Sequence, residues 1–329
     1  MSEAASPLLI SVDWGTTSLR CMLVDGNGAV LAHVKSDRGI LKTDGQAFGD
    51  VLFSQIAPWL ERFPAAARVS VLLSGMIGSR QGWREAAYLR CPASPQDLAR
   101  NLLEIDTAGT QLSGCDVRIV PGMDIADPTD DRVLPDVMRG EETQVFGALL
   151  GAGLTDGVFV LPGTHSKWVL VEQGTIAKFH TFMTGEVYAA LLDGTIIGRL
   201  AEDDVESDEG FALGVETATR ANDWAGPGQL LNMVFTARSR VLHGELEPSA
   251  VRGYLSGMLI GAEILSGSKA GMVVSGERQA RSAYVIGEDV LRDRYEKAAR
   301  LLGVETKTAT ENPVPVAHLA IARLAGLVA

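Results

Sequence analysis

Two short loops in this chain combine glycine with hydroxyl side chains directly after an apolar run. The first occupies residues 13–18 (DWGTTS) and the second residues 162–166 (PGTHS). Backbone N–H groups in such loops can surround an anion, because glycine has no Cβ to obstruct them. Asp13 adds a carboxylate, which makes sense if a hydrated divalent cation lies between it and the anion. The pattern predicts two phosphate-binding loops and a metal-side carboxylate at Asp13.

Each assignment competes with a structural alternative. An aspartate at this position could be an ordinary β-turn residue, and a single histidine is more often structural than a ligand. The residues expected to contact phosphate are Gly15, Thr16 and Thr17 in the first loop and Gly163, Thr164, His165 and Ser166 in the second.

The same order of elements surrounds both loops. Residues 8–34 are typical of strand, loop, strand, turn and strand, and residues 158–179 repeat that order. The repeat predicts an α/β chain with two related domains that face each other across a cleft. We draw the boundary at a glycine-containing hinge, with residues 1–152 in the first domain and 153–329 in the second. The last helix is expected to pack back on the first domain.

Helical periodicity and short apolar runs alternate through the rest of the chain. Residues 43–44 are expected to cap a helix, and the Asp- and Pro-rich residues 121–135 to form a loop. Three glycines within a helix at 251–265 should let another backbone approach closely. The other expected helices are at 48–60, 95–103, 141–150, 186–192, 210–222, 290–302 and from 316, and the other strands at 69–74, 117–120, 272–276 and 283–287.

Composition limits the class of protein. The chain has 329 residues, 46% hydrophobic and 21% charged, with a net charge of -12. That charge argues against a nucleic-acid or acidic-membrane partner, since binding phosphate backbones needs clustered cations. Cys21, Cys91 and Cys115 lack metal-type spacing and are interpreted as reduced thiols of a cytoplasmic protein. No signal peptide or membrane span is expected.

Five motifs, taken together and in this order, resemble the 2-dehydro-3-deoxygalactonokinase family of the actin, Hsp70 and sugar-kinase superfamily. They lie at residues 13–18, 74–83, 139–144, 161–168 and 183–186. The resemblance implies two ribonuclease-H-like domains facing each other across a nucleotide cleft. It also implies ATP- and Mg²⁺-dependent phosphorylation of 2-dehydro-3-deoxy-D-galactonate to its 6-phosphate in galactonate catabolism. The sugar-acid site would lie in the first domain and the adenosine site in the second.

The resemblance also suggests a general base. Sugar kinases of the superfamily place an acidic residue after a glycine ahead of the second phosphate loop, which matches Glu141. Glu142 is the second candidate and Asp13 the third. A glutamate departs from the aspartate common among these kinases and resembles the exopolyphosphatase branch. The structural alternative is that both glutamates only favour a helix N-terminus.

A carboxylate substrate is best bound by a planar bidentate donor. Arg80 and Arg84 are the expected donors, Trp83 is an apolar wall, and Arg139 is an alternative donor. Gly287, with Ser275 and Gly276 before it, is expected on the adenine side.

Two other functions remain open on the sequence alone. One is an exopolyphosphatase-like phosphohydrolase, and the other is a non-catalytic ATP-binding regulatory protein. A homodimer is the default expectation for a soluble enzyme, and the expected partners are otherwise only the sugar acid and ATP.

Overall fold

The computed structural model describes residues 6–63, 68–126, 133–202, 207–221, 229–269, 283–309 and 312–329. The chain divides into two compact units. Unit 1 comprises Met1–Asp156, Val171–Lys178 and Thr310–Ala329, and unit 2 comprises Gly157–Leu170 and Phe179–Ala309. The domain boundary drawn between residues 152 and 153 stays a prediction.

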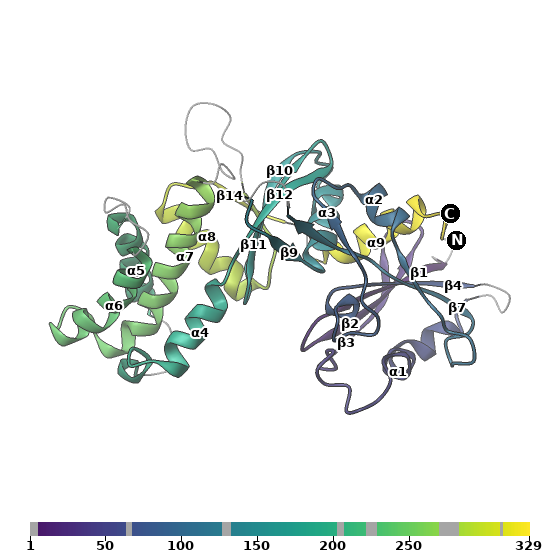
Figure 1. The fold of residues 1–329 in the computed structure, drawn as a ribbon, viewed down its shortest axis with the longest axis horizontal. Helices are drawn as coiled ribbons and strands as arrows, with labels where there is room; N and C mark the ends of the chain where they lie inside the picture. Colours follow the sequence, from purple (N-terminus) through teal and green to yellow (C-terminus); the bar gives the residue numbers. More distant parts are fainter. Residues whose placement is uncertain are drawn as a thin grey trace, which may run out of the picture. The chain divides into compact units, whose positions relative to one another are not determined.

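Unit 1 is built on a six-stranded sheet in the order β3-β2-β1-β4-β7-β6 (Figure 1). β1 pairs antiparallel with β2 and parallel with β4, so strand direction changes beside the first loop. A separate three-stranded sheet has the order β5-β8-β9. The strands are β1 Pro7–Trp14, β2 Leu19–Asp25, β3 Val30–Ser36, β4 Val69–Ser74, β5 Tyr88–Arg90, β6 Leu103–Ile105, β7 Cys115–Ile119, β8 Gly122–Ile125 and β9 Asp136–Met138, and the helices are α1 Phe48–Leu60, η1 Met76–Gly78, α2 Pro95–Arg100, α3 Glu141–Gly151 and α9 Pro313–Leu324.

The five-stranded sheet, whose strands lie mainly in unit 2, repeats the arrangement in the order β12-β11-β10-β13-β14. The two orders match strand for strand, with β3, β2, β1, β4 and β7 corresponding to β12, β11, β10, β13 and β14. The six-stranded sheet has one extra edge strand, β6. The prediction of an α/β chain with two ribonuclease-H-like units is confirmed. The strands are β10 Gly157–Leu161, β11 Ser166–Glu172, β12 Thr175–Phe182, β13 Ala283–Val285 and β14 Thr306–Thr308, and the helices are α4 Thr184–Gly194, η2 Gly198–Leu200, α5 Asp208–Ala221, α6 Gln229–Leu242, η3 Pro248–Ala250, α7 Val251–Lys269 and α8 Asp289–Leu301.

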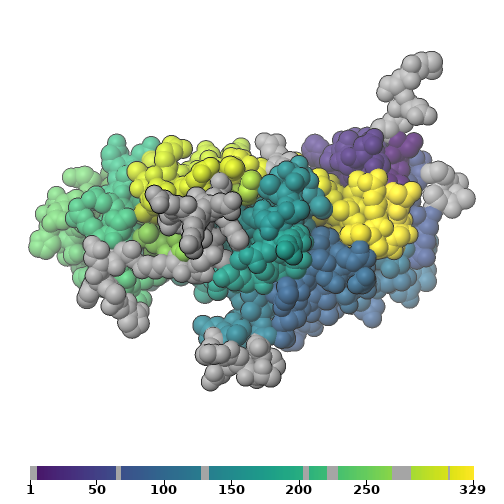
Figure 2. All heavy atoms as spheres, turned by 90° about the horizontal axis from the view of Figure 1, so that it is seen from above, coloured from purple at the N-terminus to yellow at the C-terminus, as the bar shows by residue number. Residues whose placement is uncertain are grey.

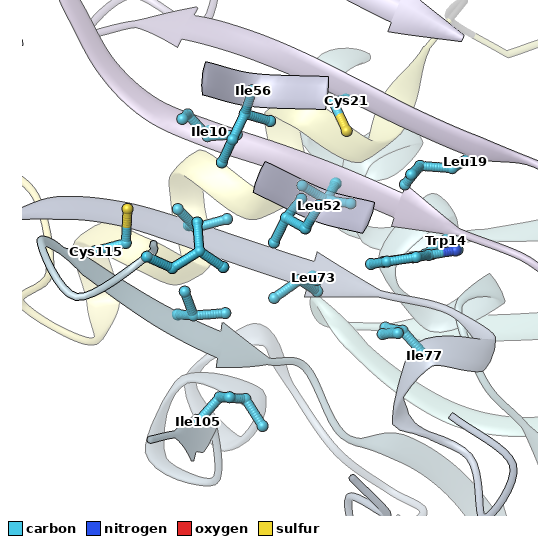
Figure 3. Packing of buried hydrophobic residues seen from close by; sticks show 14 of the residues in the cluster. Ile10, Trp14, Leu19, Cys21, Leu52, Ile56, Leu73, Ile77, Ile105 and Cys115 are labelled. Atoms are coloured by element: carbon cyan, nitrogen blue, oxygen red, sulfur yellow. The ribbon is translucent and has the colours of Figure 1, made fainter. Parts of the chain in front are cut away.

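The core of unit 1 lies between the large sheet and α1. Figure 3 shows Leu52 and Ile56 of α1 against the strand residues Ile10 and Leu73. Trp14, also fully buried, fills the space where β1 ends. Burying each such side chain contributes on the order of 1.5–3 kcal/mol. This packing holds the base of the first loop in place.

The glycines of α7 allow the close helix packing that the sequence predicts. An added Cβ on Gly253 or Gly257 would meet the backbone of α5, and one on Gly261 would lie 3.0 Å from Ala218 Cβ. Figure 1 shows α5, α6 and α7 side by side in green. The prediction that another backbone approaches this helix is confirmed.

Several local predictions were wrong. Ala47, not a residue at 43–44, precedes the first turn of α1, because the chain turns once more before the apolar face reaches the sheet. Residues 122–125 form β8 within the expected loop, since β5 and β9 provide pairing partners that are distant in sequence. Residues 103–105 form strand β6 rather than the end of a helix, because they pair with β7. The strands β5 and β14 and the helix α6 were not predicted, and the strand expected at 272–276 lies outside the described residues.

The C-terminal helix α9 packs on α3 and β1 within unit 1. In Figure 2 its yellow residues lie against the purple N-terminal strands. His318 of α9 is fully buried, and its Nδ1 is 2.8 Å from Ser11 Oγ of β1. Among the described residues, His318 Nε2 has no hydrogen-bond partner. Burial therefore lowers the pKa of His318 to about 3.

This depressed pKa makes the folded chain sensitive to acid. The unfolded chain binds a proton at His318 near its ordinary pKa of about 6.5, while the folded chain resists it. Stability is therefore complete above about pH 6.5, and about 1.4 kcal/mol is lost for each pH unit below it until the folded pKa is reached. We expect urea unfolding to show that the free energy of unfolding of wild type falls by this amount per pH unit relative to that of His318→Asn. The exposed His33→Asn is the matched control, and parallel pH curves for His318→Asn and wild type would contradict the prediction.

No helix in the described part of the chain is both long and apolar enough to cross a bilayer.

Candidate active site

Asp13 lies at the carboxyl end of β1, where the first loop begins. Its Cα pairs with Ser74 of β4 on one side and with Arg20 of β2 on the other. Arg20 Nη1 is 3.6 Å from Asp13 Oδ2, and the Asp13 side chain is 17% exposed. Burial raises the pKa of Asp13, while the Arg20 charge lowers it and the Glu141 charge raises it. Asp13 and Glu141 are therefore close enough to interact electrostatically.

Glycines bring these two carboxylates together. Gly75, after β4, has a φ of 93°, and an added Cβ would lie 2.8 Å from Trp14 O and 3.5 Å from Asp13 Oδ1. Gly140, before α3, has a φ of 102°, and its Cβ would lie 2.9 Å from Gly75 Cα. A side chain at either glycine would be strained and would separate the segments. The close approach joins the ends of β1, β4 and α3.

Glu141 is the first residue of α3 and is half-buried. Its Oε2 accepts a hydrogen bond of 2.8 Å from the backbone N–H of Arg139. This bond fixes one oxygen of the carboxylate. The geometry leaves Glu141 as the half-exposed carboxylate of the predicted glutamate pair.

Glu142 is fully buried and takes a different position. Its Oε2 accepts a 2.7 Å hydrogen bond from the Gly140 N–H, and its Oε1 accepts one of 2.9 Å from Thr143 Oγ1. Burial, followed by the Glu141 charge, raises the pKa of Glu142 to about 8. Glu142 is therefore mostly neutral at pH 7 and stabilises the turn that carries Glu141. Its role as a base stays a prediction, which this burial disfavours.

The first loop is open on its outer side. Thr16 and Thr17 are exposed, and Gly15 N–H donates to Ser18 O at 2.9 Å to close the turn. The following segment supports it from below, with Ile40 N–H donating to Gly15 O at 3.0 Å. The loop is thus a supported turn with its hydroxyl residues facing outward, as a phosphate contact requires.

The two arginines expected to bind the substrate carboxylate lie on the surface. Arg80 has a side chain that is 86% exposed and lies 3.7 Å from Glu85. Arg84 is also exposed, whereas Trp83 is half-buried and packs against the core cluster beside Gly49. Arg139 differs from both, because it is buried against Tyr88. The structure thus separates Arg139 from the exposed pair.

The second loop connects β10 and β11 in unit 2. Thr164 and His165 are exposed, and an added Cβ on Gly163 would meet no atom within 4 Å. His165 Nε2 is 2.5 Å from Glu186 Oε2, at the start of α4. Ser166 is fully buried, so its hydroxyl lies beneath the loop surface. Contact of Ser166 with phosphate stays a prediction.

A cavity of about 400 Å³ opens beside this loop. Its lining comes from the loop, the start of α4, α7 and α8. The residues are Pro162, Gly163, Thr164, Thr184, Gly185, Tyr188, Ser256, Ile260, Glu288, Leu291, Arg294 and Tyr295. Gly287 lies next to the lining residue Glu288, and its added Cβ would be 3.6 Å from Pro162 Cδ. Ser275 and Gly276 lie outside the described residues.

A buried polar network supports the wall of this cavity. Glu263 of α7, 3% exposed, accepts hydrogen bonds from Trp168 Nε1 at 2.8 Å and Tyr295 Oη at 2.7 Å, and a further one from Thr184 Oγ1. Ser166 Oγ is 2.7 Å from Tyr295 Oη. The network ties the second loop to α4, α7 and α8. Our sequence reasoning missed Glu263, although a single acidic residue within an apolar helix is a usable signal.

The residues around Asp13 fit a bound Mg²⁺. Within the described residues, no group of three or more His, Cys, Asp or Glu side chains could hold a metal ion. Mg²⁺ does not need such a cage, because it commonly keeps several waters and takes one or two carboxylates together with substrate phosphates. Asp13, with Glu141 nearby, offers hard oxygen ligands of that kind.

Comparisons of this chain with a family model and with known proteins all indicate the same family. A model of the family described as 2-keto-3-deoxy-galactonokinase matches residues 13–321. A probable 2-dehydro-3-deoxygalactonokinase of Rhizobium meliloti (strain 1021) is 32% identical over 298 residues, covering 90% of both chains. The 2-dehydro-3-deoxygalactonokinase of Escherichia coli (strain K12) is 33% identical over 257 residues, covering 78% of this chain and 79% of that one.

A solved structure agrees with these relatives. It is of a Sinorhizobium meliloti protein provisionally assigned as a 2-dehydro-3-deoxygalactonokinase. The TM-score is 0.80 at 30% sequence identity, and the match covers 97% of this chain and 98% of that one. These similarities give no support to the phosphohydrolase or regulatory alternatives.

Proposed function

This chain belongs to the 2-keto-3-deoxy-galactonokinase family, and we propose that it transfers the γ-phosphoryl group of ATP to 2-dehydro-3-deoxy-D-galactonate. The acceptor is the terminal hydroxyl, and the product is the 6-phosphate. The observation that carries the proposal, beside family membership, is the approach of Glu141 to Asp13 at the glycine contact between β4 and α3.

Glu141 is the proposed general base. Its Oε2 accepts a hydrogen bond from the Arg139 backbone N–H, which orients the half-buried carboxylate, and this carboxylate would accept the proton of the acceptor hydroxyl. Moving that proton as the O–P bond forms avoids a positively charged oxygen. Phosphoryl transfer needs little further covalent help, so positioning and electrostatics supply most of the rate.

Asp13 would hold Mg²⁺, directly or through water, beside the phosphates. The metal, when bound, neutralises charge on the β- and γ-phosphates. Gly15, Thr16 and Thr17 supply donors on the exposed side of the first loop. Burial raises the pKa of Asp13, and the charge of Arg20, 3.6 Å away, offsets part of that rise.

The cavity in unit 2 is the proposed nucleotide pocket. Its volume of about 400 Å³ is within the range of small-ligand sites. Gly163, Thr164 and His165 would contact phosphate at one side, and Gly287 would lie on the adenine side. Because the reaction consumes ATP, we place the enzyme in the cytoplasm. A homodimer stays a prediction.

ADP release tests the proposal directly. We expect turnover with ATP and Mg²⁺ only when 2-dehydro-3-deoxy-D-galactonate is present, within a panel that includes the gluco epimer. A reaction without acceptor is the control. Equal ADP release with and without acceptor would indicate a phosphohydrolase, and no release under any condition would indicate a non-catalytic protein.

A further inference from the structure

Arg139 is a buried cation with unused hydrogen-bond donors. The residue is 8% exposed, and its Nη2 donates to Ala86 O at 2.7 Å. Its Nε and Nη1 are buried and have no hydrogen-bond partner among the described residues. Leaving a buried donor of a charged group unpaired costs free energy, so the two unpaired donors of Arg139 need an explanation.

The small sheet β5-β8-β9 holds this guanidinium under an aromatic ring. Arg139 follows β9 directly, and Tyr88 is the first residue of β5. Arg139 Cζ lies 4.3 Å from the centroid of the Tyr88 ring. Gly122 of β8 permits this position, because an added Cβ would lie 2.8 Å from Tyr88 Cε1. The sheet therefore orients a cation–π pair.

Arg139 is also connected to the candidate active site through its backbone, while its guanidinium reaches back to η1. The backbone N–H of Arg139 donates to Glu141 Oε2, and an added Cβ on Gly78 would lie 3.0 Å from Arg139 Nη1. Gly78 belongs to η1, which directly follows Gly75. A ligand held by Arg139 would therefore lie near the segment that carries Glu141.

We propose that the unused donors of Arg139 bind the carboxylate of the acceptor beneath Tyr88, and that this pair selects a sugar acid over a neutral sugar. Tyr88 is 40% exposed and its ring lies over the guanidinium, while Nε and Nη1 of Arg139 stay unpaired and would donate to the carboxylate. A neutral acceptor would leave the Arg139 charge unpaired, which penalises its binding. This inference rests on the proposed function and assigns its specificity.

The test compares the sugar acid with a neutral analogue that carries an amide in place of the carboxylate. We expect Arg139→Gln to raise KM for the sugar acid on the order of 10²-fold, with KM for ATP unchanged. The preference for acid over amide should fall by a similar factor. Arg100→Gln, on the exposed side of α2, is the matched control and should change neither value. A folded Arg139→Gln enzyme that keeps the wild-type preference would overturn the proposal.

Tyr88 provides a second test that does not depend on the folding of an Arg139 variant. Tyr88→Ala should raise KM for the sugar acid about tenfold, the loss of a desolvated cation–π contact. Tyr88→Phe keeps the ring and should restore the wild-type value. An unchanged KM in Tyr88→Ala would count against the role of the pair, whatever the fate of Arg139→Gln.

Calorimetric titration with the sugar acid in the absence of ATP separates this inference from the proposed reaction. If wild type releases no ADP yet binds the acid, and Arg139→Gln does not bind it, the reaction is wrong and the carboxylate site stands. Equal binding by both proteins overturns the site alone. Absence of binding to wild type overturns both.

Discussion

Replacing Glu141 with glutamine is expected to lower kcat by a factor on the order of 10²–10⁴, the usual range for loss of a general base. Glutamine keeps the size of the side chain and can still accept the Arg139 N–H bond, but it cannot take up the proton of the acceptor hydroxyl. The ATP dissociation constant should stay at its wild-type value, because the change lies on the acceptor side. Steady-state kinetics and nucleotide titration measure the two quantities.

Glu142→Gln is the matched control for this variant. The pKa of Glu142 is raised to about 8, so the wild-type side chain is mostly neutral at pH 7 and glutamine resembles it in charge and shape. We expect Glu142→Gln to keep kcat within about tenfold, because only a buried hydrogen bond changes. The reverse ranking of the two variants would make Glu142 the base. Near-normal turnover in both would direct the search to Asp13→Asn.

A large effect on stability is expected at Gly257 of α7. An added Cβ there would lie 2.0 Å from the carbonyl oxygen of Phe211 in α5, far inside the normal contact distance. Because that neighbour is backbone, the helices must separate, and Gly257→Ala should cost at least about 1–3 kcal/mol, the usual range for overpacking. Urea unfolding gives this difference directly.

Gly194→Ala controls for the helical preference of alanine itself. Gly194 ends α4 in the same unit, and an added Cβ there would meet no atom within 4 Å. We expect its stability to be unchanged or raised by up to about 1 kcal/mol, because alanine favours helices over glycine. Equal stabilities for the two alanine variants would mean that α5 and α7 are not packed as closely as described.

Local signals were sufficient for most elements that have a strong pattern. The strand, loop and strand order around Gly15 and around Gly163 predicted the two units, because apolar runs and turn residues are visible at neighbouring positions of the sequence. The prediction failed for short strands that lack such a pattern. β8, Gly122–Ile125, is a strand only because β5 and β9 lie on either side of it.

The candidate site follows the same division. Asp13, Glu141 and the two loops were named from residue type and position, but their assignment to a site remains a prediction. Nothing local distinguishes Glu141 from Glu142, because adjacent helix residues point in different directions and only the packing of α3 decides which one is buried. In the same way, the sequence ranked the exposed Arg80 above Arg139.

What the sequence by itself determined is the repeated α/β plan, its glycine-containing loops and the family to which the chain belongs. Only the tertiary structure decided that Asp13 lies within electrostatic range of Glu141, that Arg139 lies under Tyr88, and that Glu263 supports the second loop. The physical reason is how far apart in the sequence the interacting residues lie. Secondary structure depends on neighbours a few residues apart, whereas burial, pKa and unpaired donors depend on side chains brought together from distant segments.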